Sequence, residues 1–239
     1  MKIKAIIWDY DGTIVDTHIK NLNVTRKIIE YITGQKLENI PALTNLDNYR
    51  IVANKAKNWR ELYKNEFALD EVEIDEAGKL WSEFQLKDET EVPFYDGITE
   101  VIKALKDYPH GIVSQNSKEN IRQCLQKNNF LKYFNSILGY EEVDTDKQKP
   151  EPDGLMTCIS VLVPQEQGTI IYIGDNETDI RCAINANTVY KENRSKLNVI
   201  SIGAVYDDDA NISNWQVRPD FIAEKVEDII EIIKTCEKR

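Results

Sequence analysis

Short runs of apolar residues recur along the chain, and each one stops at a polar segment. The first run is 3–8, which ends at Asp9, and similar runs cover 111–114, 169–174 and 198–205. Apolar runs of about four to eight residues with polar flanks are typical of buried strands in a parallel sheet. We therefore expect these segments to be strands of one parallel sheet.

Helical patterns separate the strand segments. They cover 97–106, 118–126, 155–162 and 179–186, and the polar stretch 190–196 is expected to be a loop. Strands that alternate with helices predict an α/β fold with a doubly wound parallel sheet, in which helices cover both faces. We expect this fold class for most of the chain.

The stretch 17–92 breaks the alternation. Its apolar residues recur at helical spacing, as at Leu22 and Ile28, and it has no apolar run comparable to the strand segments. Further helical patterns cover 48–67 and 75–86. We therefore expect an all-helical insertion between the first strand and the rest of the sheet.

The length of the chain agrees with this division. At roughly 150 residues per domain, 239 residues correspond to about one and a half domains. We assign the α/β domain to 1–16 and 93–239, and the inserted helical domain to 17–92.

The net charge narrows the class of partner. Lysine and arginine number 30 against 41 aspartates and glutamates, which gives a net charge of −11. Proteins that bind nucleic acids need a basic surface for the phosphate backbone. We therefore expect no nucleic-acid partner.

The N-terminus and the cysteines indicate the cellular compartment. The apolar run 3–8 is far shorter than a signal-peptide core or a membrane span, so we expect no membrane contact and a cytoplasmic location. The four cysteines, Cys124, Cys158, Cys182 and Cys236, show no metal-ligand spacing. We expect them to be reduced thiols, mostly buried.

Polar residues with chemical potential follow the predicted strands. They are Asp9 and Asp11 in the segment 9–13, Ser114, Lys149, and Asp175 and Asp179 in the segment 174–179. Open parallel sheets bind their ligands at the carboxyl ends of the strands. We therefore expect these side chains to converge at one edge of the sheet.

Carboxylates at a strand end suit phosphoryl transfer. An aspartate can attack phosphorus to give an aspartyl-phosphate, and Asp9 stands at the strand tip. A carboxylate and a phosphate would repel each other by about 4 kcal/mol per charge pair at about 4 Å and an effective dielectric near 20. A divalent cation is therefore required, and carboxylate ligands with phosphate and water are typical of Mg²⁺. Asp9 and Asp175 are the expected ligands.

In this order, the motifs resemble the signature of the haloacid dehalogenase-like hydrolases, which is DxDGT, then Ser or Thr, then Lys, then GDxxxD. The helical insertion resembles the small cap of the phosphoglycolate phosphatase-like and β-phosphoglucomutase-like members. The resemblance covers essentially the whole chain. It departs from the common pattern at 114–116, where Ser-Gln-Asn stands in place of the frequent Thr-Asn.

The resemblance implies a role for each carboxylate. Asp9 would be the nucleophile and Asp11 the general acid, which protonates the leaving oxygen and then takes a proton from the attacking water. The Asp11 backbone carbonyl would join Asp9 and Asp175 as a ligand of Mg²⁺. Asp179 would support the cation or orient Lys149.

The remaining motif residues would hold the substrate. Ser114 and Lys149 would bind the phosphoryl oxygens, with Lys149 acting on the charge of the transition state. Gly12 would let the backbone approach the phosphate closely, and Thr13 is assigned to the same substrate-binding loop.

Simple structural roles remain open for several of these residues. Asp175 and Ser114 could cap the helices that follow them, and Lys149 could be an exposed lysine. His110, after Tyr-Pro, is expected in a turn. In the insertion, Trp59, Arg60 and Tyr63 lie at helical spacing and are expected to be divided between the core and the solvated face.

The expected function is that of a Mg²⁺-dependent phosphatase. It would hydrolyse a small phosphorylated metabolite, a phosphomonoester, through an aspartyl-phosphate on Asp9. A phosphomutase or phosphotransferase with the same machinery is the first alternative, and a noncatalytic binding module of the same fold is the second. Haloacid dehalogenation is disfavoured, because that chemistry calls for neither Asp11 nor a Mg²⁺ site.

Overall fold

The chain forms two compact units. A computed structural model describes residues 2–56, 59–207, 210 and 212–238. One unit consists of Met1–Asp16 and Phe94–Arg239, and the other is Thr17–Pro93. We call them the sheet unit and the helical unit, and Pro93 is grouped with the helical unit, one residue from the expected boundary.

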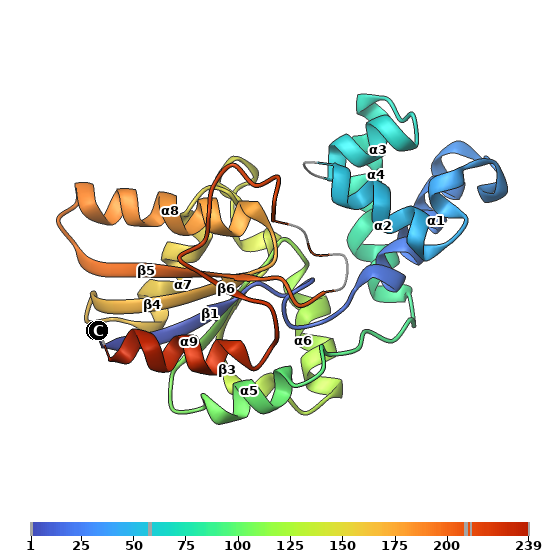
Figure 1. Cartoon of the computed structure of the whole chain (residues 1–239). Helices are drawn as coiled ribbons and strands as arrows, with labels where there is room; N and C mark the ends of the chain where they lie inside the picture. The colour runs from blue at the N-terminus through green and yellow to red at the C-terminus, as the bar shows by residue number, and fades with distance from the viewer. Residues whose placement is uncertain (1, 57–58, 208–209, 211, 239) are drawn as a thin grey trace. The chain divides into compact units, whose positions relative to one another are not determined.

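Six strands form a single sheet in the sheet unit. They are β1 (Ile3–Trp8), β2 (His110–Val113), β3 (Phe134–Leu138), β4 (Gln167–Gly174), β5 (Lys196–Ala204) and β6 (Phe221–Ala223). Their order is β3-β2-β1-β4-β5-β6, and all neighbouring pairs are parallel (Figure 1). The four expected strands are confirmed, and β3 and β6 are additional.

The strand order places a switch point at β1. From β1 the chain proceeds to β2 and β3 on one side, and later to β4, β5 and β6 on the other. Trp8, the last residue of β1, pairs with Ile112 of β2 and with Ile173 of β4. The segments that follow β1, β2 and β4 therefore emerge together at the carboxyl edge of the sheet, where such folds bind ligands.

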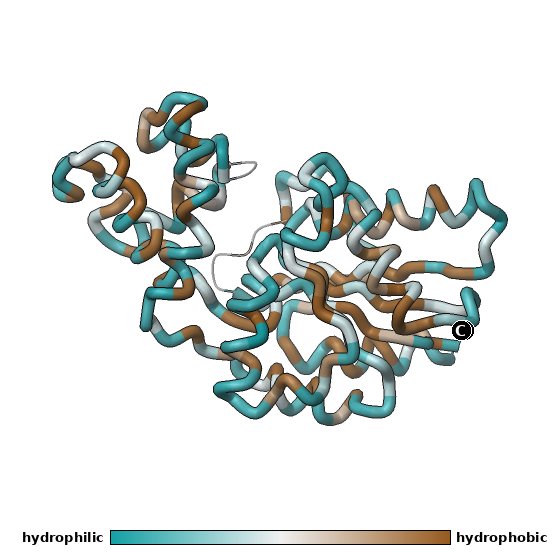
Figure 2. Tube along the Cα trace, turned by 180° about the vertical axis from the view of Figure 1, so that it is seen from behind, coloured by the Kyte–Doolittle hydropathy of each residue, from teal (hydrophilic) through white to brown (hydrophobic). Residues whose placement is uncertain are grey.

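Helices cover both faces of the sheet, so the expected fold class is confirmed. The helices are α5 (Ile98–Ala104), α6 (Lys118–Lys127), α7 (Asp153–Leu162), α8 (Glu177–Glu192) and α9 (Asp228–Glu237). Figure 1 shows α8 and α9 on opposite sides of the sheet. On one face, strand residues such as Ile7 and Ile170 pack against Ile159 of α7 and Ala183 of α8. Figure 2 shows the hydrophobic residues concentrated along the strands.

The helical unit has its own apolar core. Its main helices are α1 (His18–Thr33), α2 (Leu46–Lys55), α3 (Trp59–Glu66) and α4 (Glu71–Lys87). Leu22, Ile28, Tyr63 and Ile74 are among the side chains buried between them. Helix α1 ends at Gly34, whose left-handed backbone (φ 63°) lets its N–H donate to the Glu30 carbonyl.

Three helical expectations need correction. The pattern 48–67 is divided between α2 and α3. Helix α4 begins before the expected residue 75, because Asp70 and Glu73 form a reciprocal capping box at its start. Helix α8 extends into the expected loop 190–196 and ends at Glu192, and its Tyr190 is buried.

His110 lies in the sheet and not in a turn. It is the first residue of β2 and is 1% exposed. Its Nδ1 accepts a hydrogen bond from Trp8 Nε1 at 2.9 Å, and its Nε2 lies 3.0 Å from the Leu105 carbonyl oxygen. The ring is therefore neutral, with its proton on Nε2, and burial lowers its pKa.

The four cysteines form no disulfide, and Cys158, Cys182 and Cys236 are buried. Among the helices of the described residues, none combines the length and the apolar character that crossing a bilayer requires.

Candidate active site

The loop after β1 packs closely against the Asp175 carboxylate, which follows β4. Asp9 continues β1, and its N–H donates to the Ile173 carbonyl at 2.8 Å. Gly12 follows with φ of 76°, and a Cβ atom added there would lie 2.2 Å from Asp175 Oδ2. Gly12 is therefore required by the close approach of Asp175 as well as by its own backbone conformation.

Three carboxylates converge at this edge of the sheet. Oxygens of Asp9, Asp175 and Asp179 lie within 4.8 Å of one another. Burial raises the pKa of Asp9 to about 7, against the opposing effect of Lys149. Burial and the charge of Asp9 also raise the pKa of Asp175 well above its ordinary value. The cluster therefore holds more negative charge than its surroundings favour.

Lys149 is the cation that the structure provides for this cluster. Its Nζ donates to Asp9 Oδ1 at 2.5 Å and to Asp179 Oδ1 at 2.7 Å. Its side chain is only 6% exposed. Burial alone would lower its pKa, but the two carboxylates raise it above the ordinary value. Lys149 is thus a buried, charged lysine, and the alternative of an exposed lysine is wrong.

Asp179 is fixed by contacts from several elements. Its Oδ1 also accepts a hydrogen bond from the Tyr172 hydroxyl at 3.0 Å, and its Oδ2 accepts one from the Asn176 N–H at 3.1 Å. A Cβ atom at Gly174 would lie 2.4 Å from Asp179 Cγ, so only glycine fits there. Asp179 therefore holds Lys149 in place from a rigid position.

The Asp11 carboxylate turns toward the loop after β2. Asn116 Nδ2 donates to both of its oxygens at 3.0 Å, and Ser114 Oγ lies 3.4 Å from its Oδ2. Ser114 and Asn116 are 5% and 4% exposed. The structure thus brings the expected general acid together with the expected phosphate-binding hydroxyl, and adds Asn116.

Helix capping does not account for Ser114 or Asp175. The N-cap of α6 is Ser117, whose Oγ accepts from the Asn120 N–H at 3.2 Å. The N-cap of α8 is Asn176. Both alternatives are therefore wrong, and these two polar side chains need another explanation.

Thr13 is tied to Asp175 and to a pair of tyrosines. Its Oγ1 donates to Asp175 Oδ1 at 3.3 Å, and its backbone carbonyl accepts a hydrogen bond from the Tyr206 hydroxyl. The Tyr206 ring packs edge-on against Tyr95, with centroids 5.2 Å apart. The loop after β5 therefore supports the loop after β1.

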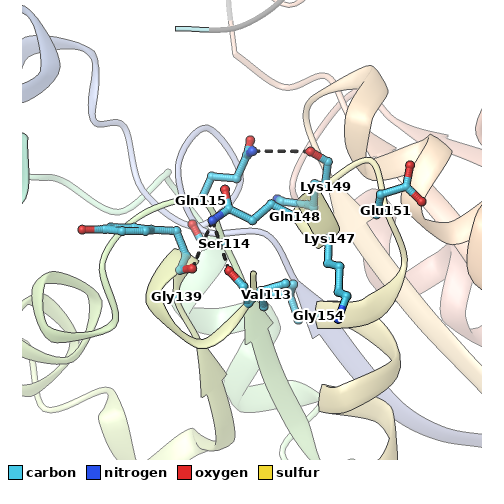
Figure 3. A pocket seen from close by; sticks show the side chains of 11 residues that line it. Val113, Ser114, Gln115, Gly139, Lys147, Gln148, Lys149, Glu151 and Gly154 are labelled. Atoms are coloured by element: carbon cyan, nitrogen blue, oxygen red, sulfur yellow. Dashed lines mark hydrogen bonds between the residues drawn. The ribbon is translucent and has the colours of Figure 1, made fainter. Parts of the chain in front are cut away.

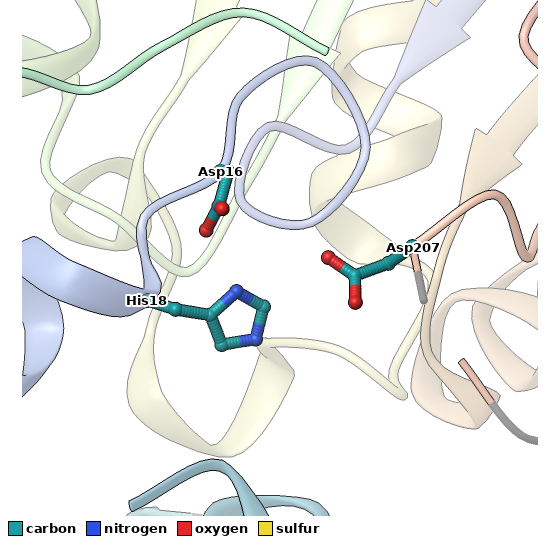
Figure 4. A group of neighbouring side chains, drawn as sticks. All are labelled: Asp16, His18 and Asp207. Atoms are coloured by element: carbon teal, nitrogen blue, oxygen red, sulfur yellow. The ribbon is translucent and has the colours of Figure 1, made fainter. Parts of the chain in front are cut away.

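A second acidic pair lies near these tyrosines. The Tyr95 hydroxyl donates to Asp207 Oδ2 at 2.7 Å. A carboxylate oxygen of Asp207 lies within 4.8 Å of one of Asp16, and both residues belong to the sheet unit (Figure 4). His18, drawn in the same figure, is the first residue of α1 in the helical unit.

A small pocket lies between the loops that carry Ser114 and Lys149 (Figure 3). Gln115, Gly139 and Gln148 contribute to its lining. Gln115 Nε2 donates to the Lys149 carbonyl at 3.4 Å, a bond drawn in Figure 3. Ser114 and Lys149, the two residues expected to bind phosphoryl oxygens, also line this pocket.

Two residues of this site could not be found from the motifs. Tyr172 lies inside an apolar strand run, and the only signal was a hydroxyl among isoleucines. Asn116 follows the expected hydroxyl by two residues, within the departure from the family pattern. In the helical unit, Arg60 forms ion pairs with Asp75 and Glu71, and Tyr63 is buried, as expected for a solvated face and a core.

Comparisons with known proteins agree with the geometry. The model of a family described as haloacid dehalogenase-like hydrolase matches residues 6–190. Pyrophosphatase PpaX of Listeria monocytogenes is 27% identical over 240 residues, which cover 98% of this chain and 97% of the relative.

Solved structures match over the same length. A predicted phosphoglycolate phosphatase from Haemophilus somnus superposes with a TM-score of 0.72 at 19% identity, covering 98% of this chain and 99% of that one. A haloacid dehalogenase-like family hydrolase from Streptococcus pneumoniae has a TM-score of 0.70 at 19% identity, covering 97% and 98%. Because both identities are 19%, these likenesses support the fold alone.

Proposed function

The chain belongs to the haloacid dehalogenase-like hydrolases, and we propose that it is a Mg²⁺-dependent phosphatase that hydrolyses a small phosphomonoester. The observation that carries the proposal is the buried cluster of Asp9, Asp175 and Asp179 around Lys149 at the switch point of the sheet. Such a cluster costs folding free energy, so its presence at a ligand-binding edge indicates a catalytic site.

The donor set fits a magnesium ion. Asp9 and Asp175 offer oxygen ligands, and their raised pKa values indicate negative charge without enough compensation. We assign Mg²⁺ to these two carboxylates together with the Asp11 backbone carbonyl, as the family resemblance implies. A cation bound there supplies Lewis-acid stabilisation of the phosphoryl group.

Asp9 is the proposed nucleophile. Lys149 binds its Oδ1, so we assign the attack on phosphorus to Oδ2. The product is an aspartyl-phosphate, which water then hydrolyses. Lys149, held by Asp179, keeps the Asp9 carboxyl oriented and neutralises part of its charge.

The remaining residues bind the phosphoryl group and manage the proton. Ser114 and Lys149 are proposed to bind phosphoryl oxygens, and Gly12 and Thr13 form the loop beside them. Asp11 is proposed to protonate the leaving oxygen and to take a proton from the attacking water. The helical unit is proposed to serve as a cap that excludes water during the reaction.

Pyrophosphate is a second candidate substrate. It is favoured by the name of the Listeria relative, which is 27% identical over nearly the whole chain. Asp9 would attack one of its phosphorus atoms, and phosphate would be the leaving group. A phosphomutase remains the alternative in which the phosphoryl group passes to a sugar and not to water.

The test is Asp9→Asn in a screen of phosphomonoesters and pyrophosphate with added Mg²⁺. The variant should release no phosphate, because the nucleophilic carboxylate is lost. It should keep the fold, because one carboxylate oxygen is replaced by an NH2 group of similar size. Asp107→Asn, an exposed aspartate at the amino end of β2, is the matched control and should retain activity. Retained turnover in Asp9→Asn would contradict the mechanism, and formation of an isomer without free phosphate would favour the mutase.

A further inference from the structure

Asn116 is a buried polar residue that the motifs do not include. It lies between the end of β2 and the start of α6, and it is 4% exposed. A buried side-chain amide is retained only where its hydrogen bonds are satisfied. Asn116 and its partners Asp11, Ser114, Ser117 and Asn120 all belong to the sheet unit.

The orientation of the Asn116 amide is fixed by its neighbours. Its Oδ1 accepts from the Ser117 N–H at 2.7 Å and from Asn120 Nδ2 at 3.1 Å. A backbone N–H can only donate, so the oxygen of the amide must face Ser117. The Nδ2 group therefore faces Asp11, where it donates to both carboxylate oxygens at 3.0 Å.

The backbone of Asn116 organises the neighbouring hydroxyl as well. Its N–H donates to Ser114 Oγ at 3.1 Å. Ser114 Oγ in turn lies 3.4 Å from Asp11 Oδ2. One residue thus holds both the hydroxyl assigned to the phosphoryl group and the carboxyl assigned to the leaving oxygen.

We propose that Asn116 is the positioning residue for proton transfer by Asp11. The inference rests on the proposed function, because it assumes that Asp11 is the proton donor of a phosphatase. Asn116 touches neither the substrate nor the cation in this account. It acts by keeping the Asp11 carboxyl beside the phosphoryl group.

The amide supports Asp11 in both states of the reaction. When Asp11 carries the proton, its carbonyl oxygen accepts from Asn116, and its hydroxyl is left to donate to the leaving oxygen. Asp9 then forms its bond to phosphorus, the bond to the leaving oxygen breaks, and that oxygen takes the proton from Asp11. Asp11 becomes a carboxylate, which accepts from Nδ2 with both oxygens, as the structure has it. The oxygen of a water molecule then bonds to phosphorus, the bond between phosphorus and Asp9 breaks, phosphate leaves, and the proton of the water returns to Asp11.

This role predicts a dependence on the leaving group. An alkoxide is strongly basic and needs a proton as it leaves, whereas p-nitrophenolate is a weak base that leaves without one. General acid catalysis contributes about 10²–10⁴-fold where it is needed. Loss of the positioning contact should therefore affect alkyl phosphates and spare p-nitrophenyl phosphate.

The experiment compares kcat/KM for two substrates in the full-length protein with Mg²⁺. The substrates are p-nitrophenyl phosphate and whichever alkyl phosphate the wild type hydrolyses fastest. Asn116→Ala should lower kcat/KM for the alkyl phosphate by roughly 10–100-fold and for p-nitrophenyl phosphate by less than about 3-fold. Since kcat/KM reports the steps up to the first irreversible transfer, hydrolysis of the intermediate does not mask the difference.

Ser117→Ala is the matched control. It removes the N-cap of α6 from the same loop and leaves the amide donor to Asp11 in place. It should lower the melting temperature without changing the ratio of the two kcat/KM values. In an Asp11→Asn background, Asn116→Ala should produce no further change in that ratio.

The outcomes separate this inference from the proposed function. If Asn116→Ala lowers both kcat/KM values equally, or raises the value for the alkyl phosphate, the positioning role is wrong even though the enzyme is a phosphatase. If the wild type releases phosphate from neither substrate, or if Asp9→Asn remains active, the proposed function itself is wrong.

Discussion

The two units differ in how deeply their ion pairs are buried. In the helical unit, the core cluster is made of apolar and aromatic side chains such as Leu22 and Phe67, and the buried Asp88 pairs with Lys27, whose side chain is 48% exposed. Arg60 of this unit pairs with Asp75 at the surface, where the side chains are 42% and 60% exposed. In the sheet unit, Lys149, Asp9 and Asp179 form ion pairs with side chains that are 6%, 7% and 1% exposed.

The difference shows which charges serve stability and which serve a site. Burying an ion pair costs desolvation energy that its attraction often fails to repay, whereas apolar packing stabilises directly. A fold selected for stability alone would use the arrangement of the helical unit throughout. The buried charges of the sheet unit are therefore best explained by the chemistry at the strand ends.

Removal of Lys149 should produce the largest change in stability. Lys149→Met leaves Asp9 and Asp179 buried without a cation, and we expect the free energy of unfolding to fall by about 3–5 kcal/mol. Lys147→Met is the matched control. Its ion pair with Asp144 joins side chains that are 49% and 73% exposed, so it should cost less than about 1 kcal/mol. Equal losses in denaturant titrations of the two variants would remove the contrast between the units.

Asp175→Asn should stabilise the metal-free protein. The folded-state pKa of Asp175 is raised above its ordinary 3.8, so this group makes folding less favourable as the pH rises above 3.8. We expect a gain of about 0.5–2 kcal/mol at pH 7.5 that vanishes toward pH 4. Addition of Mg²⁺ should raise the melting temperature of the wild type and not that of the variant. A variant less stable than the wild type at pH 7.5 would contradict the assignment.

His110, a buried neutral side chain of the sheet unit, should have a smaller effect on stability, and this effect should depend on pH. Its pKa is lowered by burial, so the unfolded chain takes up the proton more readily, and stability falls as the pH drops below 6.5. Between pH 6.5 and 5.5 this contribution is at most about 1.4 kcal/mol. In His110→Gln, the amide can accept from Trp8 and donate to Leu105 without titrating. The wild type should therefore lose more stability than the variant over this range, and parallel curves would exclude the effect.

Arg60→Gln in the helical unit should have the smallest effect. Its pairs with Asp75 and Glu71 are solvent-exposed, and such pairs contribute roughly 0–1 kcal/mol. We expect a change of less than about 1 kcal/mol in the free energy of unfolding, which shrinks further at high salt. A loss as large as that of Lys149→Met would mean that the helical unit also depends on charge.

The strands that carry the site were predictable because charge interrupts them. Strand β1 has the expected bounds, since its apolar run stops at Asp9. Strands β3 and β6 were missed because they lie at the two edges of the sheet and are partly exposed, so neither reads as an apolar run. The early start of α4 is encoded locally, because Asp70 and Glu73 carry the spacing of a capping box.

The candidate site was predictable only as a set of motifs. Each motif residue follows a strand or precedes a helix, so the fold class alone suggests a shared edge. The contacts depend on three-dimensional register, since Lys149 meets Asp9 across 140 positions of sequence. Tyr172 and Asn116 have no motif of their own, and only the structure shows that their polar groups hold Asp179 and Asp11.

The stereochemistry of phosphoryl transfer tests the central claim most directly. The claim is that the buried charges of the sheet unit carry out two successive in-line displacements, first by Asp9 and then by water. Hydrolysis of a phosphorothioate monoester made chiral at phosphorus with two oxygen isotopes, in water of the third isotope, should give chiral thiophosphate with retained configuration, because two inversions cancel. Inversion of configuration would show direct attack by water and would contradict an aspartyl-phosphate on Asp9.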